Sequence, residues 1–328
     1  MPKPFYLHVG LQRCASTLIE NVFFKPGHDV FDALRANGIQ PLFELFLLLR
    51  DHAEDQYWTA DAVDRLRAAE FHPLLANSDA AGFFLSDESL SLTCREHGPG
   101  IDVEARAHHL ARLLDGFEAR IILIVRDQAS FIRSLYALHL QNLGAKDRDA
   151  FVADIPEDAL DWRRLAMLYA DVFGHDRVVV LPYNAGCYGA DAPFEDFMPA
   201  MQTSVGIPFP VPVPRTQLYN PSLMGEYFDV QRAANQALPI DIATELSQLL
   251  RAAREKAKPE AVIRVFRDKY GTDVGDALRE IYAAASFDRD GGFTEDAQRA
   301  NLARFGAANR ALFRDFMPDF DPAPFLAG

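Results

Sequence analysis

Apolar residues gather in short runs along the first part of the chain, and these runs predict β-strands. The run Ala119–Val125 is nearly continuous in β-branched residues, which is typical of a parallel strand that is buried on both faces. Five segments show such a pattern, the last of them weakly: Tyr6–Gly10, Gly82–Glu88, Ala119–Val125, Arg177–Tyr183 and Gly38–Phe43.

Helical patterns lie between these runs. A helix is expected from about Ser16, and others over Asp61–Phe71, Val103–Phe117, Ala129–Leu143 and Leu160–Phe173. The alternation of strands and helices predicts an α/β fold, with a central parallel sheet of about five strands and helices on both faces. In such sheets, ligands bind beyond the carboxyl ends of the strands.

The pattern changes after Tyr183. The stretch Gly206–Ser222 is rich in proline and is expected to be extended, whereas the pattern from Leu223 onward is helical. A last long helix is expected after Thr294, whose hydroxyl suits an N-cap. Two carboxylates follow Thr294, and negative charge is favourable at the N-terminal end of the helix dipole. We therefore expect an α/β core over residues 1–215 and a helical part over residues 216–328 that packs on it within one domain.

Composition narrows the classes of function. The formal net charge of −14 argues against general binding to nucleic acid, anionic membranes or anionic polymers, unless a local basic cleft overrides it. The three cysteines are widely separated, which argues against a disulfide framework or a zinc site and favours a reduced, cytoplasmic protein. No signal-type segment is seen at the N-terminus, and the apolar run Pro41–Leu49 is too short to span a bilayer, so it is expected to form a core helix.

The segment between the first strand and the first helix has the layout of a phosphate-binding loop. It reads Gly10-Leu11-Gln12-Arg13-Cys14-Ala15-Ser16-Thr17. Compared with the triphosphate loop G-x-x-x-x-G-K-[ST], Ala15 stands at the second glycine, Ser16 replaces the lysine, and Arg13 supplies a cation. The N–H groups of residues 14–17 can converge on an anion at the helix N-terminus, with help from Arg13, Ser16 and Thr17. The alternative is a strand–turn–helix joint that binds nothing.

A second segment follows the strand Ala119–Val125. Arg126 lies at the carboxyl end of that strand, and Ser134 follows eight residues later in the next predicted helix. An arginine and a hydroxyl in these places can hold a second phosphate, separate from the first. Taken alone, Arg126 could simply end the strand, and Ser134 could be an ordinary helical serine.

Together the two segments resemble the sulfotransferases that use 3′-phosphoadenosine 5′-phosphosulfate. In that family the first loop reads roughly G-x-x-[KR]-[SC]-[GA]-[ST]-[ST], and a later strand ends in Arg with Ser eight residues on. Weaker likenesses, notably to bacterial members, are FLSDESL, VVLPYN, RTQLYNPSL and the C-terminal FTEDAQRANLARFGAANRALF. The resemblance implies a P-loop-like, nucleotide-binding transferase that moves a sulfuryl group to a hydroxyl or amine of a carbohydrate, lipid or small molecule.

The resemblance also assigns roles to residues. Backbone groups of Cys14–Thr17 would hold the 5′-phosphate, Arg126 and Ser134 the 3′-phosphate, and Arg13 the charge on the oxygen that the sulfuryl group leaves. No metal ion would be needed, because arginines and helix dipoles would neutralise the negative charges of the donor. The expected donor-binding residues are Gly10, Gln12, Arg13, Cys14, Ala15, Ser16, Thr17, Arg126, Ser134 and Tyr183.

The base that deprotonates the acceptor is left open. The candidates are Glu88, which follows a strand predicted to neighbour the loop, and His28, which follows the first helix. Glu20 could orient Arg13 or act on the acceptor. Glu88 could instead be a carboxylate at a helix start, and His28 a loop histidine in water. His8 is expected to be structural, and no role is assigned to His139.

Two other functions compete with this interpretation. One is a kinase or NTPase that uses MgATP with Asp87 as the metal-binding acid, although the loop lacks the lysine. The other is a non-catalytic binding protein of the same fold. The acceptor pocket is expected within residues 37–71 and 219–285, and these aromatic residues could line it or simply pack helices: Phe43, Phe46, Tyr57, Trp58, Tyr219, Tyr227 and Phe228.

Overall fold

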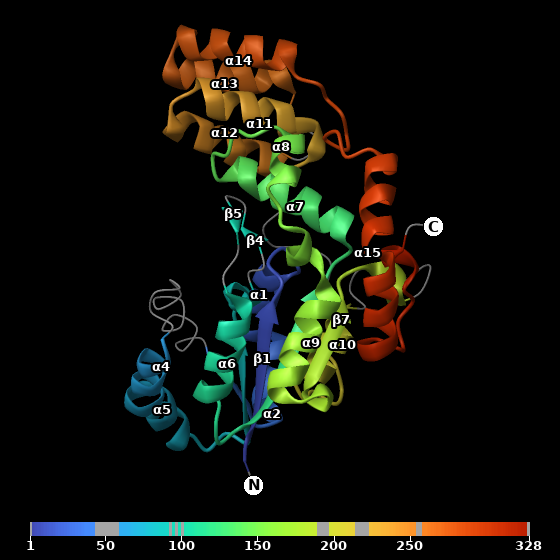
Figure 1. Ribbon diagram of the computed structural model, residues 1–328. Helices are drawn as coiled ribbons and strands as arrows, with labels where there is room; N and C mark the ends of the chain where they lie inside the picture. The colour runs from blue at the N-terminus through green and yellow to red at the C-terminus, as the bar shows by residue number, and fades with distance from the viewer. Residues whose placement is uncertain are drawn as a thin grey trace.

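The computed structural model confirms the predicted α/β fold, with a five-stranded, wholly parallel sheet at its centre (Figure 1). The structure describes residues 2–42, 59–91, 94–95, 98–99, 102–188, 197–213, 223–253 and 258–326. The strands are β1 (Pro4–Gly10), β2 (Ile39–Pro41), β3 (Gly82–Ser86), β6 (Glu118–Val125) and β7 (Val178–Pro182), and each overlaps a predicted strand. Their order across the sheet is β2-β3-β1-β6-β7.

The first strand of the chain, β1, is the central strand of this sheet. Its Leu7 lies opposite Leu85 of β3 on one side and Ile121 of β6 on the other, and all three are buried. Burial on both faces explains why these strands read as continuous apolar runs. The carboxyl ends of β1, β3 and β6 therefore meet at one edge of the sheet.

Crossover helices cover both faces. The chain moves from β1 to β2 in one direction across the sheet and from β3 to β6 in the other, so right-handed connections place their helices on opposite faces. The α-helices that connect the five strands are α1 (Ser16–Phe23), α2 (Asp29–Ala36), α4 (Ala60–Leu66), α5 (His72–Ala76), α6 (Val103–Leu113), α7 (Gln128–Gln141), α8 (Arg148–Ala153) and α9 (Trp162–Phe173).

Most helix boundaries agree with the prediction to within a few residues. Aspartate side chains cap the N-termini of several helices. At α9 the Asp161 carboxylate accepts the Arg164 N–H at 2.9 Å, and the helix begins two residues after its predicted start. The predicted helix 61–71 becomes π-helical from Arg67. The short elements α2, α8, α10 (Phe197–Ser204), β4 (Cys94–Arg95) and β5 (Gly98–Pro99) were not predicted.

The C-terminal part is helical, as predicted. It contains α11 (Phe228–Ala237), α12 (Ile240–Ala253), α13 (Pro259–Tyr270), α14 (Thr272–Ala284) and α15 (Glu295–Phe316). Figure 1 shows α11 to α14 gathered beyond α7, while α15 runs back beside α9. Thr294 caps α15 as expected, since its hydroxyl accepts the Ala297 N–H at 3.3 Å.

Two expected segments lie largely outside the described residues. The proline-rich stretch is described as far as Val213, without helix or strand after Ile207, and the expected core helix over Pro41–Leu49 is not described from residue 43 onward. Among the helices that the structure describes, none has the length and apolar character needed to cross a membrane.

A buried pair of amides ties α7 to α15. Gln128 and Asn309 are 0% and 1% exposed, and each donates its side-chain N–H to the carbonyl oxygen of the other, at 3.0 and 2.9 Å. Gln128 also donates to the Leu160 carbonyl oxygen at 3.1 Å, and Asn309 to that of Phe325 at 2.8 Å. Four segments that are distant in sequence are thereby joined at the start of α7.

We predict that Asn309→Ala destabilises the fold strongly. The change leaves the Gln128 side-chain oxygen and the Phe325 carbonyl oxygen buried without this donor, which should cost at least about 2 kcal/mol of unfolding free energy. Urea unfolding monitored by circular dichroism measures it. Asn77→Ala is the control, because Asn77 is exposed and bonds only its own helix. Equal, small effects of both changes would contradict the prediction.

Candidate functional site

The loops that follow β1, β3, β6 and β7 meet at the carboxyl edge of the sheet. The Arg126 Nη1 atom lies 3.5 Å from the Arg13 carbonyl oxygen. Gly10 packs so closely on the turn after β3 that a Cβ atom there would lie 3.2 Å from the Glu88 carbonyl oxygen. The strand order changes direction beside β1, and such a switch point is where open α/β sheets bind ligands.

The β1–α1 loop has an unusual backbone. Arg13 and Ala15 both have φ of 64°, the left-handed region that residues with a Cβ rarely adopt. The Cys14 N–H donates to the Leu11 carbonyl oxygen at 3.2 Å, so it closes a turn within the loop. This differs from the expectation that the Cys14 N–H faces an anion. The thiol itself is fully buried, and burial raises its pKa to about 12.

Helix α1 begins without a side-chain cap. Ala15 occupies the N-cap position and has no oxygen with which to accept the N–H groups of the first turn, so Ser16, Thr17 and Leu18 present theirs at the helix end. Other helices of the protein are capped by side chains, for example by Asp102, Asp127, Asp147 and Asp161. Helices α11, α13 and α14 also begin without a side-chain cap, so the uncapped start of α1 matters here only for its place at the carboxyl edge of the sheet.

Two arginines at this edge are each held by a serine of α7. Arg13 Nε donates to Ser134 Oγ at 3.0 Å, and Arg126 Nε donates to Ser130 Oγ at 3.0 Å. The serines are four residues apart, so they lie on one face of the helix. Ser134 was expected beside Arg126, but here it contacts Arg13. Ser130 was missed by sequence analysis, although its spacing of four from Ser134 could have indicated it.

Arg126 has further contacts that fix its place. Its guanidinium carbon lies 5.7 Å from the centre of the Tyr183 ring, and its carbonyl oxygen accepts the Trp162 Nε1–H at 2.8 Å. Burial raises the pKa of Tyr183 to about 12, so the ring is a neutral phenol. Among the described residues, no carboxylate forms an ion pair with Arg126.

Positive charge is therefore concentrated here, in a protein that is acidic overall. Burial lowers the pKa of Arg13, and the nearby charges of Arg126 and Arg251 lower it further. Arg251 comes from the last turn of α12, so the C-terminal helices also contribute to the field at the site. Sequence analysis missed Arg251, since nothing distinguishes it from other basic residues near helix ends.

The expected base residues lie at different distances from the loop. Glu88 is half-buried and begins the short 3-10 helix Glu88–Ser91, whose backbone packs on Gly10. His28 instead caps α2, its Nδ1 accepting the Val30 N–H at 3.2 Å. The eight residues of α1 carry the chain about 12 Å from the loop before His28 is reached. Glu20 lies in the second turn of α1 and is half-buried.

The remaining polar candidates are held within the fold. His8 is fully buried and shares a hydrogen bond of 2.8 Å with Ser86 Oγ. His139 is buried, and its Nε2 accepts the Lys146 N–H at 3.3 Å. Asp87 is 2% exposed, and its Oδ1 accepts the N–H and the hydroxyl of Ser89 at 2.9 and 2.6 Å.

Of the aromatic residues expected at an acceptor pocket, Tyr227 and Phe228 are both buried, and Phe228 packs edge-on against Tyr136 at 5.3 Å. Both residues pack in the helical part, and Phe228 also lines the pocket described next. The other five lie outside the described residues: Phe43, Phe46, Tyr57, Trp58 and Tyr219.

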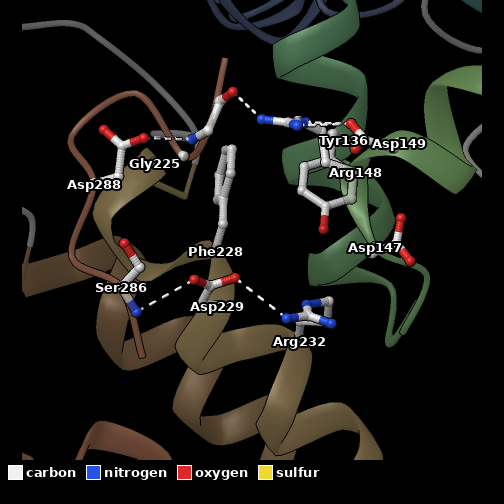
Figure 2. Close-up of a pocket in the computed structure, with 12 residues that line it drawn as sticks. Tyr136, Asp147, Arg148, Asp149, Gly225, Phe228, Asp229, Arg232, Ser286 and Asp288 are labelled. Atoms are coloured by element: carbon white, nitrogen blue, oxygen red, sulfur yellow. Dashed lines mark hydrogen bonds and ion pairs between the residues drawn. The ribbon is translucent and has the colours of Figure 1, made fainter. Parts of the chain in front are cut away.

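A separate pocket of about 280 Å³ lies between α7, α8, α11 and the turn before α15 (Figure 2). Its charged groups are satisfied by one another and by backbone. The Arg148 side chain pairs with Asp149, Asp229 accepts from Arg232 and from the Ser286 N–H, and Asp288 accepts two backbone N–H groups. None of the residues expected at the donor site lines it.

Comparisons with other proteins supply no family. No protein-family model matches the chain, and neither curated proteins nor solved structures give a match. The function must therefore be argued from the site itself.

We predict that Ala15→Gly stabilises the protein by about 0.5–1 kcal/mol. Glycine relieves the cost of a Cβ at φ of 64°, and this gain exceeds the extra freedom that glycine gives the unfolded chain. Urea unfolding measures the change. Ala303→Gly, in the exposed middle of α15, should instead destabilise by about 1 kcal/mol. A destabilising Ala15→Gly would show that the loop does not have this backbone.

We also predict that His8 makes stability depend on pH. Burial lowers its pKa from 6.5 to about 3, so its contribution is complete above 6.5 and is lost as pH falls towards 3. Relative to wild type, His8→Gln should gain unfolding free energy as pH falls from 6 to 4, by up to about 1.4 kcal/mol per unit. The exposed His108, replaced by Gln, should give no such trend. Parallel curves for all three proteins would contradict the prediction.

Proposed function

We propose that the protein is a sulfotransferase that takes its sulfuryl group from 3′-phosphoadenosine 5′-phosphosulfate. One observation carries the proposal: Arg13 and Arg126 lie together at the switch point of the sheet, each held through Nε by a serine of α7, beside the uncapped start of α1. Partly buried guanidinium groups and a helix N-terminus are a suitable environment for a ligand with two separate phosphate groups.

The residues present suit such a donor. The N–H groups of Ser16 and Thr17 at the α1 terminus would hold the 5′-phosphate, while Arg126 would hold the 3′-phosphate and Tyr183 would border the base. Ser134 now has a role different from the one expected, since it positions Arg13. Gly10 allows the close approach of the loop to the turn after β3, because a Cβ there would crowd that turn.

In the proposed reaction, the bond between sulfur and the bridging phosphate oxygen breaks as a bond from sulfur to the acceptor oxygen forms. Arg13 stabilises the negative charge that grows on the bridging oxygen, and the product nucleotide is adenosine 3′,5′-bisphosphate. The acceptor proton goes to a carboxylate. We assign that role to Glu88 rather than to His28, because Glu88 adjoins the loop whereas His28 caps α2.

We also propose that the protein acts in the reducing cytoplasm, because its three widely separated cysteines do not suit a disulfide framework. A kinase that uses MgATP is the main competing function. Asp87 would have to bind the metal in that case, yet its Oδ1 already accepts two hydrogen bonds from Ser89. The second competing function is a non-catalytic protein that binds the nucleotide without turning it over.

Binding of adenosine 3′,5′-bisphosphate, measured by calorimetry without divalent metal, tests the proposal. Wild type should bind it more tightly than MgATP, and Arg126→Ala should weaken binding about 10- to 100-fold, because a charged hydrogen-bond donor is lost. Arg120→Ala is the matched control, since Arg120 is an exposed arginine of β6 paired only with Glu118.

Turnover of the donor over a panel of acceptors tests the chemistry. Arg13→Ala should lower kcat about 10²- to 10³-fold, with the unfolding midpoint near that of wild type, because charge stabilisation in the transition state is lost. Tight metal-dependent binding of ATP with no binding of the bisphosphate would favour the kinase. Bisphosphate binding without turnover of any acceptor would favour the non-catalytic protein.

A further inference from the structure

The contacts of Ser130 form a short directional chain that ends on Arg126. Arg126 Nε donates to Ser130 Oγ at 3.0 Å, and the Ser130 hydroxyl donates to the Asp127 carboxylate. A hydroxyl has one proton, so giving it to Asp127 leaves the Ser130 oxygen to accept from Arg126. The arrangement therefore fixes which edge of the guanidinium faces α7.

Asp127 is itself held firmly. It is 7% exposed, its Oδ1 accepts the Ser130 N–H at 2.9 Å, and its Oδ2 also accepts from Asn184 Nδ2 at 3.4 Å. The carboxylate thus caps α7 and is anchored from the segment after β7. A rigid support of this kind holds the Ser130 hydroxyl in one orientation.

Within the described residues, Asp127 forms no direct ion pair with Arg126; the serine stands between them. A direct pair would occupy the terminal amino groups of the guanidinium, which are the groups that grip a phosphate with two parallel bonds. The intervening hydroxyl uses only Nε. It steadies the cation and keeps the fork of Arg126 directed away from the acid.

We propose that Ser130, supported by Asp127, is a positioning residue that aims Arg126 at the 3′-phosphate of the nucleotide. The inference rests on the proposed function and adds to it the reason why this site would discriminate nucleotides with a 3′-phosphate from those without. Ser130 does not touch the ligand in this proposal; it acts through Arg126.

Calorimetry with two ligands tests the inference: adenosine 3′,5′-bisphosphate, and adenosine 5′-phosphate, which lacks the 3′ group. Ser130→Ala should weaken binding of the bisphosphate about tenfold and leave that of the monophosphate within about twofold. Ser130→Thr retains the hydroxyl and should restore most of the affinity. Ser130→Asp would place a carboxylate directly against Arg126 and should weaken the bisphosphate at least as much as Ser130→Ala.

Kinetics and a control separate positioning from stability. Ser130→Ala should raise KM for the donor about tenfold with kcat changed less than threefold, since Arg13 is untouched. Ser204→Ala is the control, because the Ser204 hydroxyl bonds only the Ala200 carbonyl oxygen of its own helix; it should bind both nucleotides as wild type does.

The outcomes separate this inference from the proposed function. If wild type prefers the bisphosphate and Ser130→Ala keeps that preference unchanged, the positioning role is wrong and the proposed function stands. If Ser130→Ala weakens both nucleotides equally, the serine merely supports the fold and the inference is again wrong. If wild type shows no preference for the bisphosphate, the proposed function fails and this inference fails with it.

Discussion

Two positive charges lie together at the end of β1 and β6, and much of the surrounding structure holds them there. Arg13 and Arg126 repel one another, which is one cause of the lowered pKa of Arg13. The repulsion is offset by hydroxyl acceptors on α7 and by the Tyr183 ring, all supplied by elements that start at the same edge. Anionic groups bound beside these guanidinium groups would offset that repulsion, as the proposed donor would with its two phosphates.

The placement of α7 decides whether this arrangement holds. Its first turn is fixed by the amide pair of Gln128 and Asn309. The Asn235 side chain of α11 donates to the carbonyl oxygen of Leu140 in the last turn at 2.8 Å, and to that of Gly144 in the loop that follows at 2.7 Å. Arg133 in its middle donates to the Arg289 carbonyl oxygen at 2.8 Å. The C-terminal part, through α11, α15 and the turn before α15, thus contacts the start, the middle and the end of the helix that carries the two serines. Residues far from the site in sequence therefore support its geometry.

The strands and the residues directly after them could be predicted, because both depend on the local pattern of apolar residues. Continuous apolar runs gave the five strands, and the positions of Arg13 and Arg126 just beyond two of them placed both at the carboxyl edge. Sequence analysis could not predict which serine meets which arginine, because that depends on the rotation of α7 against the sheet. It did not resolve whether Ala15 adopts positive φ, since the loop backbone is set by the packing of Gly10 on the next turn. The role of Ser130 was hidden because a serine in a helix is ordinary until its partners are known.

The central position of β1 has a consequence for how the chain folds as it is made. The strand is synthesised before both of its neighbours, β3 and β6, and β6 ends only at Val125. At ordinary rates of translation, about 6 to 23 s separate the synthesis of Gly10 from that of Val125. Through that interval the apolar segment Phe5–Val9 has no partner on one or both edges, and parallel pairing over such distances along the chain forms slowly. The nascent chain is therefore exposed to aggregation, and open to help from chaperones, until β6 has emerged and can pair with β1.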